Sequence, residues 1–273
     1  MPFLLAFLVA SMVACLPLQA APAPDFLNAP LWDGGKAELT LYQAREIRYG
    51  TARDCEVRLI TVKEPWNDRL GVKADGNGDR EVIKLNQIVS VPTGTYRYEQ
   101  MHSLFLDRKT GRALKFSYSH HDACGNTFKM GRFLDNILTF TWHTYWDGEG
   151  DGVQNLPWSE TTHLYEELPL RVRMWASEGK VDPSQITLLN PQMNSRLGKP
   201  ATATARVQVS AAGGEFHYTV THDNGKDLLV VDNAFPHTLR SWTRADGATW
   251  TLRKTLMLDY WNKNQSGDEK WLK

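Results

Sequence analysis

Histidine, aspartate and cysteine, the residue types that bind metal ions, lie close together in HHDAC, residues 120–124. Neighbouring strand residues face opposite sides, so His120 and His121 converge on one ion only where a turn reorients one of them. The acidic loops at residues 75–79 and 147–152 offer oxygen ligands of the kind calcium prefers. Both lack the glutamate that closes a calcium loop. We therefore predict solvated turns here, with no metal and no cofactor.

Aromatic side chains gather in LTFTWHTYW, residues 138–146. Read as a strand, this segment places Phe140, Trp142 and Trp146 on one face. Such a face stacks against a sugar ring or lines a lipid-sized cavity when it is open, and forms ordinary core when it is closed. Trp142 and Trp146 are the candidate ligand-binding residues, with the core interpretation kept open beside them.

No residue pattern marks a catalytic site. The GxSxG turn of α/β-hydrolases is absent, and the acidic pair Glu166-Glu167 lies in a predicted helix, where solvation would account for it. Catalytic triads and carboxylate pairs assemble from distant positions, so a hydrolase with a scattered site stays as the alternative. We predict a non-catalytic protein and name no catalytic residue.

Alternating strands dominate the elements that would position these residues. Residues 96–133 predict three antiparallel strands, in which Phe116 and Tyr118 alternate with polar residues, and Gly111 supplies the positive φ of a bulged hairpin. Asn224-Gly225 is a second strong hairpin signal. Further strands are predicted at residues 37–42, 56–62, 81–91, 206–209, 216–220, 237–244 and 249–260.

One helix is predicted, at residues 159–175, with Ser159 as its cap and Leu164, Leu168 and Val172 at helical spacing. Pro169 must kink this helix or begin a second segment. The fold class is therefore mainly β: a curved antiparallel sheet or half-barrel with one covering helix.

The N-terminus predicts export. Residues 3–18 are apolar and uncharged, too short for a comfortable membrane span, and are followed by small residues and prolines. Cleavage after Ala20 would make residues 1–20 a signal peptide. The alternative is a lipobox-like MVAC that makes residues 1–14 a lipoprotein signal and Cys15 the acylated first residue. The expected location is periplasmic or outer-membrane-anchored.

The rest of the chain divides into an N-terminal arm at residues 21–35, a single antiparallel β domain at 36–261, and a polar tail at 262–273. Two cysteines remain after processing. In an oxidising compartment Cys55 and Cys124 are a candidate disulfide, and the alternative is two unpaired thiols.

The composition limits the partners. Lys plus Arg (31) equals Asp plus Glu (31), so no net charge favours nucleic acid, and membrane contact is expected only through a lipid anchor. With 42% hydrophobic residues and ten tryptophans, the chain has material for a substantial core.

Three stretches carry a resemblance: AELTLYQAREIRYGTARDCEVRLITV, YEQMHSLFLDRKTGRALKFSYS and DLLVVDNAFPHTLRSWTRADGATWTLRKT. They resemble a family of uncharacterised exported bacterial envelope proteins, a domain of unknown function similar to lipoprotein-carrier half-barrels. Some relatives carry a septum-formation-inhibitor label. The resemblance implies a curved antiparallel sheet around a helix and an envelope location, and it implies no catalytic residues.

Two functions follow. The first is a non-catalytic binding or carrier-like module whose concave sheet holds an apolar small molecule or an envelope protein, and the second is the hydrolase. The lining of the concave face distinguishes these functions. A continuous apolar lining favours a binding module, a filled interior favours a scaffold, and converging Asp, Glu or His side chains favour an enzyme.

Overall fold

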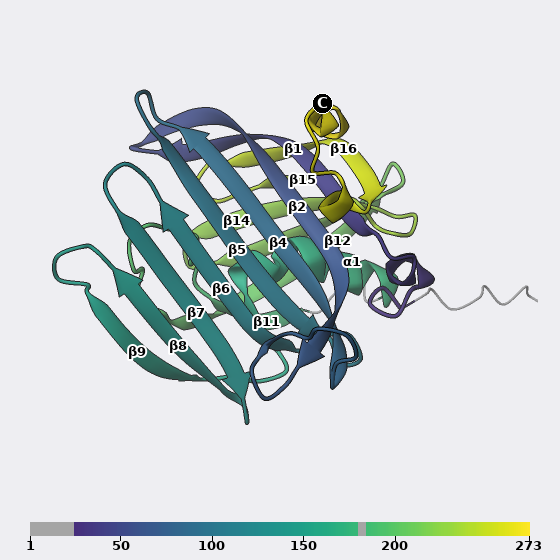
Figure 1. Ribbon diagram of the computed structural model, residues 1–273, viewed down its shortest axis with the longest axis horizontal. Helices are drawn as coiled ribbons and strands as arrows, with labels where there is room; N and C mark the ends of the chain where they lie inside the picture. The colour runs from purple at the N-terminus through teal and green to yellow at the C-terminus, as the bar shows by residue number, and fades with distance from the viewer. Residues whose placement is uncertain (1–24, 180–183) are drawn as a thin grey trace, which may run out of the picture.

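The computed structural model of the chain describes residues 25–179 and 184–273. Sixteen strands form one open sheet in the order β10-β11-β12-β13-β14-β15-β16-β1-β2-β4-β5-β6-β7-β8-β9, with β3 paired only to β2 (Figure 1). Within the described ranges, β10 and β11 are the one parallel pair. The predicted mainly β, antiparallel fold is confirmed. Residues 1–20, with Cys15 and Ala20, lie outside the described residues.

The elements have the following bounds. The strands are β1 (Ala37–Arg48), β2 (Thr51–Asn67), β3 (Val72–Lys73), β4 (Arg80–Pro92), β5 (Arg97–Asp107), β6 (Ala113–His121), β7 (Asn126–Leu134), β8 (Ile137–Thr144), β9 (Asp151–Pro157), β10 (Thr162–Leu164), β11 (Gln185–Leu189), β12 (Thr202–Ala212), β13 (Glu215–His222), β14 (Gly225–Asp232), β15 (Leu239–Thr243) and β16 (Thr249–Leu258). The helices are α1 (Leu168–Ser177) and the short 3₁₀ helices η1 (Pro30–Asp33), η2 (Tyr165–Glu167), η3 (Tyr260–Asn262) and η4 (Asp268–Leu272).

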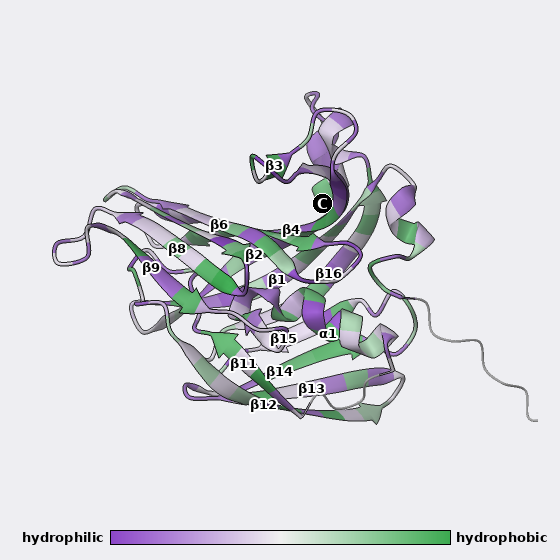
Figure 2. Cartoon of the chain, turned by 90° about the horizontal axis from the view of Figure 1, so that it is seen from below, coloured by the Kyte–Doolittle hydropathy of each residue, from purple (hydrophilic) through white to green (hydrophobic). Residues whose placement is uncertain are grey.

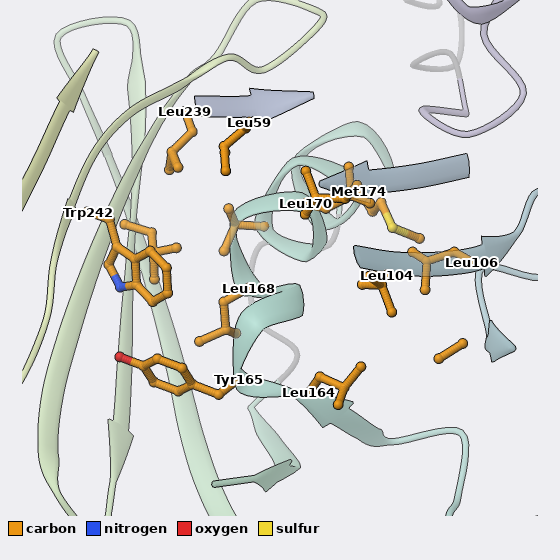
Figure 3. Close-up of a cluster of buried hydrophobic side chains, with 14 of the residues drawn as sticks. Leu59, Leu104, Leu106, Leu164, Tyr165, Leu168, Leu170, Met174, Leu239 and Trp242 are labelled. Carbon is orange, nitrogen blue, oxygen red and sulfur yellow. The ribbon is translucent and has the colours of Figure 1, made fainter. Parts of the chain in front are cut away.

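The sheet bends over on itself, so that β11–β15 form a layer facing the layer of β4–β9, with α1 between them (Figure 2). Strongly twisted sheets of this many strands curl or split because the strand twist accumulates. Leu168 and Leu170 of α1 are buried, and the helix lies among side chains that include Leu104 and Trp242 (Figure 3). The predicted covering helix is thus an interior helix, which the folded sheet encloses.

The helix is shorter than predicted. Residues 159–167 form a turn, strand β10 and η2 instead, and α1 begins at Leu168. Pro169 lies in the first turn of α1, where its missing N–H costs no helical hydrogen bond. The prediction that Ser159 caps a helix was therefore wrong. Of the two alternatives for Pro169, the start of a segment is the one observed.

An ion pair fixes α1 to the sheet. Arg173 Nη1 and Nη2 donate to Glu38 Oε1 and Oε2 on β1 at 2.6 and 2.9 Å, and both side chains are buried. The guanidinium also lies 4.7 Å from the ring centre of Phe26. This two-bond geometry sets the rotation of the helix, because a buried pair is tolerated only when its hydrogen bonds are complete.

Along the strands, the inner face changes from apolar to polar. Tyr42 and Ala44 of β1 are followed in phase by Glu46, and Leu104 of β5 is preceded in phase by Gln100. All five side chains are buried. One end of the interior therefore packs on α1, while the other end presents charged and amide groups.

The two ends of the described chain lie on different parts of the sheet. In the arm, Phe26 and Trp32 belong to the main core. In the tail, Leu272 packs against a second, smaller cluster on the sheet that includes Leu39 and Ile60. The tail therefore covers part of the sheet and does not simply project into solvent.

The predicted Cys55–Cys124 disulfide is wrong, since both cysteines are free. Cys55 lies on β2, and Cys124 lies in the turn between β6 and β7. Strands β4, β5 and β6 separate the two positions, about 14 Å at three strand spacings, whereas a disulfide needs Cα atoms within about 7 Å.

Among residues 25–179 and 184–273, no helix is both long and apolar enough to cross a membrane.

Candidate functional site

A pocket of about 440 Å³ occupies the polar end of the interior. It lies where the β1–β2, β13–β14 and β15–β16 turns meet residues 190–201, a segment between β11 and β12 that we call the strap. Most of its side chains are aromatic, charged or amide: Tyr49, Tyr98, Tyr165, Trp242 and Trp250; Glu46, Arg48, Glu166, His222, Arg244 and Asp246; Gln87, Gln100, Asn194 and Asn224. The remaining lining residues are Ile47, Val89, Pro191, Met193, Ser195 and Ala245. The volume falls within the range of about 300–1,000 Å³ typical of small-molecule sites.

Glu46 organises one wall of the pocket. Its Oε1 accepts a hydrogen bond from Trp250 Nε1 at 2.8 Å, and its Oε2 accepts one from Arg244 Nη2 at 2.6 Å. Arg48 Nη1 lies 3.5 Å from the same Oε2. The carboxylate is fully engaged, so it holds the two arginines in place and balances part of their charge.

Arg48 continues this wall toward β5. Its Nη2 donates to Gln100 Oε1 at 2.7 Å, and Gln100 Nε2 donates to Tyr118 Oη at 2.7 Å. The guanidinium also lies over the Tyr98 ring, 5.6 Å from its centre. The chain of bonds fixes Gln100, whose amide has both of its ends occupied.

Asp227 supports the opposite wall from β14. Its Oδ2 accepts from Tyr165 Oη at 2.5 Å and Trp242 Nε1 at 3.0 Å, while its Oδ1 accepts from Ala245 N at 2.8 Å and lies 3.2 Å from His222 Nε2. Burial raises the pKa of this carboxyl, but these hydrogen bonds outweigh burial and leave the pKa below its ordinary value. Asp227 is therefore ionised, and its carboxylate positions the side chains of Tyr165, Trp242 and His222.

His222 beside Asp227 is held at both nitrogens. Its Nδ1 accepts from Asn224 N at 3.3 Å, which places the ring proton on Nε2, toward Asp227. A histidine with both nitrogens occupied has no free nitrogen to act as a general base. The pair is therefore a support for the pocket wall.

Glu166 differs from these groups because one of its oxygens is unpaired. Its Oε1 accepts from the backbone N–H groups of Gln192 and Met193 at 2.6 and 3.0 Å. Its Oε2 is buried and has no hydrogen-bond partner among the described residues. Burial raises the pKa of this carboxyl, and a buried carboxyl oxygen left unpaired costs free energy. Glu166 lines the pocket, so a ligand there could supply the missing partner.

Side chains of β7 and the β8–β9 hairpin hold the strap in place by hydrogen bonds to its backbone carbonyls. Lys129 is fully buried, and its Nζ donates to Gln192 O and Arg196 O at 2.9 and 2.7 Å. Burial lowers the pKa of this amine to about 8. Thr127 Oγ1 and Trp146 Nε1 both donate to Ser195 O, at 2.6 and 3.0 Å. These contacts hold the strap as one wall of the pocket.

Tyr49 stands at the mouth of the pocket in the tight β1–β2 turn. Its φ is 54°, a left-handed conformation that a bulky residue rarely adopts, and 67% of the side chain is exposed. Its Oη contacts Tyr96 Oη at 2.5 Å and Tyr98 Oη at 2.7 Å. The other two tyrosines thus hold an exposed aromatic ring at the rim.

The two tryptophans predicted to bind a ligand do not line this pocket. Phe140 and Trp142 share the inner face of β8 as predicted, whereas Trp146 lies beyond the end of the strand. A Cβ on Gly152 would lie 2.3 Å from Trp142 Cζ2, so the indole covers this glycine, and Trp142 also borders a shallow surface hollow. The Arg196 guanidinium carbon lies over the Trp146 ring, 3.8 Å from the ring centre. The contacts of Trp146 join the β8–β9 hairpin to the strap, whereas Trp142 packs within the hairpin.

The histidines of residues 120–124 lie as the strand pattern predicts. His120 is buried and His121 is exposed, so they face opposite sides of β6. Asp122 Oδ1 accepts from the N–H groups of Cys124 and Gly125, which makes the segment a polar turn. Within the two described ranges, no group of three or more His, Cys, Asp or Glu residues could hold a metal ion.

A second pocket, of about 300 Å³, lies at the start of α1 and contains an acid–base pair. His163 Nδ1 lies 3.3 Å from Glu167 Oε1, and Arg171 Nε donates a hydrogen bond to the same carboxylate oxygen. Ser159 lines this pocket, but its Oγ is paired with Thr161 and Thr162. Among described residues, no hydrogen bond joins Ser159 to His163, so the contacts do not favour a nucleophile activated by a base.

The sequence prediction missed most of the pocket. Glu166 and Glu167 were placed on a solvated helix face, but both are buried, because η2 crosses the interior. A usable signal was present in the strands: Asp227 falls in phase with buried Leu229, as Glu46 does with Ala44. Polar residues in phase with a buried apolar row indicate an inward polar site.

No family model matches the sequence, and no curated protein matches it. One similar solved structure is the crystal structure of a beta-barrel-like protein of domain of unknown function DUF1849 from Brucella abortus, with a TM-score of 0.48 and 10% identity over 81% of this chain and 98% of that chain. We therefore infer function from the side chains of this chain.

Proposed function

We propose that the protein is a non-catalytic binding module that takes a small polar ligand in the pocket between the strap and the turns of β1, β13 and β15. The observation that carries this proposal is the buried, unpaired Oε2 of Glu166 beside a 440 Å³ pocket. Of the ten buried side-chain polar atoms without a partner among the described residues, Glu166 Oε2 is the one that belongs to a residue lining this pocket. Buried polar atoms are nearly always hydrogen-bonded, so this atom points to a missing partner there.

The polar lining changes the expected ligand class. The aromatic run at residues 138–146 favoured an apolar ligand, but the pocket presents six charged or titratable and four amide side chains. An apolar molecule would bury these groups without replacing their hydrogen bonds to water, which is costly. A polar ligand bonds to them and is the better fit.

A ligand screen with a blocked pocket tests this function. We expect polar neutral molecules such as sugars, polyols, amino acids and nucleosides to include ligands that raise the melting temperature, because binding to the folded state adds about 2.7 kcal/mol at 100 times Kd. Asn224 lies in the exposed β13–β14 turn, and its side chain makes no hydrogen bond to described residues. Asn224→Trp should fill the mouth and abolish the shift.

Asn77→Trp, in the exposed loop before β4, is the matched control and should leave binding unchanged. Stabilisation by fatty acids or detergents alone, equal in wild type and Asn224→Trp, would show that the pocket is not the site. Turnover of an ester or glycoside that is lost in His163→Ala would instead support the hydrolase alternative.

The proposed location is the cell envelope. The support is the apolar, uncharged stretch at residues 3–18 with its two processing sites. We expect the protein from an envelope fraction to begin at residue 21, or at Cys15 with acyl chains attached. Intact-mass measurement distinguishes these forms, and a full-length chain confined to the cytoplasm would refute export.

A further inference from the structure

We propose that the pocket recognises an uncharged, hydroxyl-rich ring, the chemistry of a small saccharide, with Tyr49 as the stacking ring and Glu166 as a buried hydrogen-bonding group. This inference rests on the proposed binding function and narrows its ligand class. Three features carry it: the balance of charge in the lining, the mixture of donors and acceptors, and the aromatic rim.

Charge in the lining is largely compensated from within. Arg244 pairs with Glu46 at 2.6 Å and with Asp246 at 3.3 Å, and Arg48 pairs with Glu46 at 3.5 Å. Each arginine is already paired with a carboxylate, whereas an anion-binding site would require an unpaired arginine. Because a charged ligand would have to displace these pairs, a neutral ligand is favoured.

The groups left open in the pocket include both acceptors and donors. Glu166 Oε2 has no partner, and Gln87 uses its Nε2 on the Glu166 carbonyl, which leaves its Oε1 without a bond to described residues. The Asn224 amide at the rim can both donate and accept. Hydroxyl groups both donate and accept, so several hydroxyls on one ring would satisfy this mixed set.

Aromatic rings supply the remaining element of sugar recognition. The C–H faces of a sugar ring stack on aromatic rings, while its hydroxyls bond at the edge. Tyr49 is exposed, lines the pocket and keeps a rare φ of 54°, with its hydroxyl bonded to Tyr96 and Tyr98. A strained, fixed and exposed ring at a pocket mouth indicates a functional position.

Calorimetric titration with defined saccharides tests the inference. The probes are glucose, galactose, N-acetylglucosamine and disaccharides of each, with cyclohexanol as a ring that carries one hydroxyl and glycerol as a polyol without a ring. We expect at least one saccharide to bind wild type at least tenfold more tightly than either comparison compound.

Variants then place the ligand. Tyr49→Asn keeps the left-handed turn, which asparagine tolerates, and should weaken binding at least tenfold. Tyr49→Phe keeps the ring but removes the hydroxyl that contacts Tyr96 and Tyr98, so it should weaken binding less than Tyr49→Asn does. Glu166→Gln keeps Oε1 for its two backbone donors and replaces only the unpaired oxygen, so a change above threefold in either direction reports contact there. Phe128→Ala, an exposed aromatic of β7, is the control and should bind as wild type.

The outcomes separate the two proposals. Binding of other polar molecules through the pocket without any saccharide would overturn this inference and leave the binding function standing. Saccharide binding that is unchanged in both Tyr49→Asn and Glu166→Gln would overturn the assignment to this pocket. A pocket that binds no polar probe at all would overturn both proposals.

Discussion

At the scale of single residues, the two described cysteines differ in surroundings. Cys124 is exposed in a turn, whereas Cys55 is half-buried on β2 beside Glu46. Burial, and after it the nearby negative charge of Glu46, raises the pKa of the Cys55 thiol to about 12. Thiol reactions need the thiolate, so the two residues should behave differently toward reagents.

We expect Ellman's reagent at pH 8 to label Cys124 in a fast phase and Cys55 at least about a hundredfold more slowly in the folded protein. Cys124→Ser should remove the fast phase, and Cys55→Ser should remove only the slow one. Denaturation without a reductant should make both fast. Protein that shows neither phase when unfolded would contain a disulfide, contrary to the structure.

Residue types alone could not reveal the pocket, because its members come from β1, β4, β5, β13, β15, β16, η2, the strap and the turns between strands. Residue types indicated candidate metal ligands in local clusters such as residues 120–124, and this cluster forms a polar turn. Glu166 obtains its role from tertiary burial, and no spacing within η2 indicates that burial.

At the scale of elements, Lys129 connects β7 to the strap. Its neutral amine can still donate to Gln192 O and Arg196 O. Its protonated form also loses hydration free energy because it is buried away from water. Lys129→Met leaves both carbonyls unpaired, at a cost of about 1–3 kcal/mol each. Lys226→Met on an exposed position of β14 is the control and should change stability by less than about 0.5 kcal/mol.

The stability contribution of Lys129 should depend on pH in a defined direction. Its pKa is about 8 when folded and 10.5 ordinarily. Between these values the unfolded chain binds more protons, so raising the pH favours the folded state by up to about 1.4 kcal/mol per unit. Urea unfolding at pH 7, 8.5 and 10 should show the gap between wild type and Lys129→Met widening with pH. A gap that narrows would contradict the buried amine.

Strands were predicted better than the interior elements. Period-two alternation places Phe116 and Tyr118 correctly, and Gly111 has the predicted positive φ of 68°. The start of α1 and strand β11 were missed. Their conformations depend on contacts such as Arg173 with Glu38, which the local pattern does not encode.

At the scale of the whole molecule, the sheet has two unpaired ends, at β9 and β10. The strap bonds to the β9 end of the sheet: Gln154 Nε2 of β9 donates to Pro200 O at 3.3 Å, and Glu149 Oε2 in the β8–β9 turn accepts from Leu197 N at 2.9 Å. The single helix was predicted to cover the curved sheet. Instead it fills one end of the interior, and the open space lies at the other end.

The pairing of β1 with β16 in the middle of the sheet has a consequence for how the chain is made. A ribosome delivers β1 early and β16 last, and the hydrogen bond between Glu46 and Trp250 spans 204 positions. Until synthesis nears its end, β1 has one bare edge, and bare edges recruit other chains. The pocket wall built on Glu46 is therefore completed only after nearly the whole polypeptide has emerged.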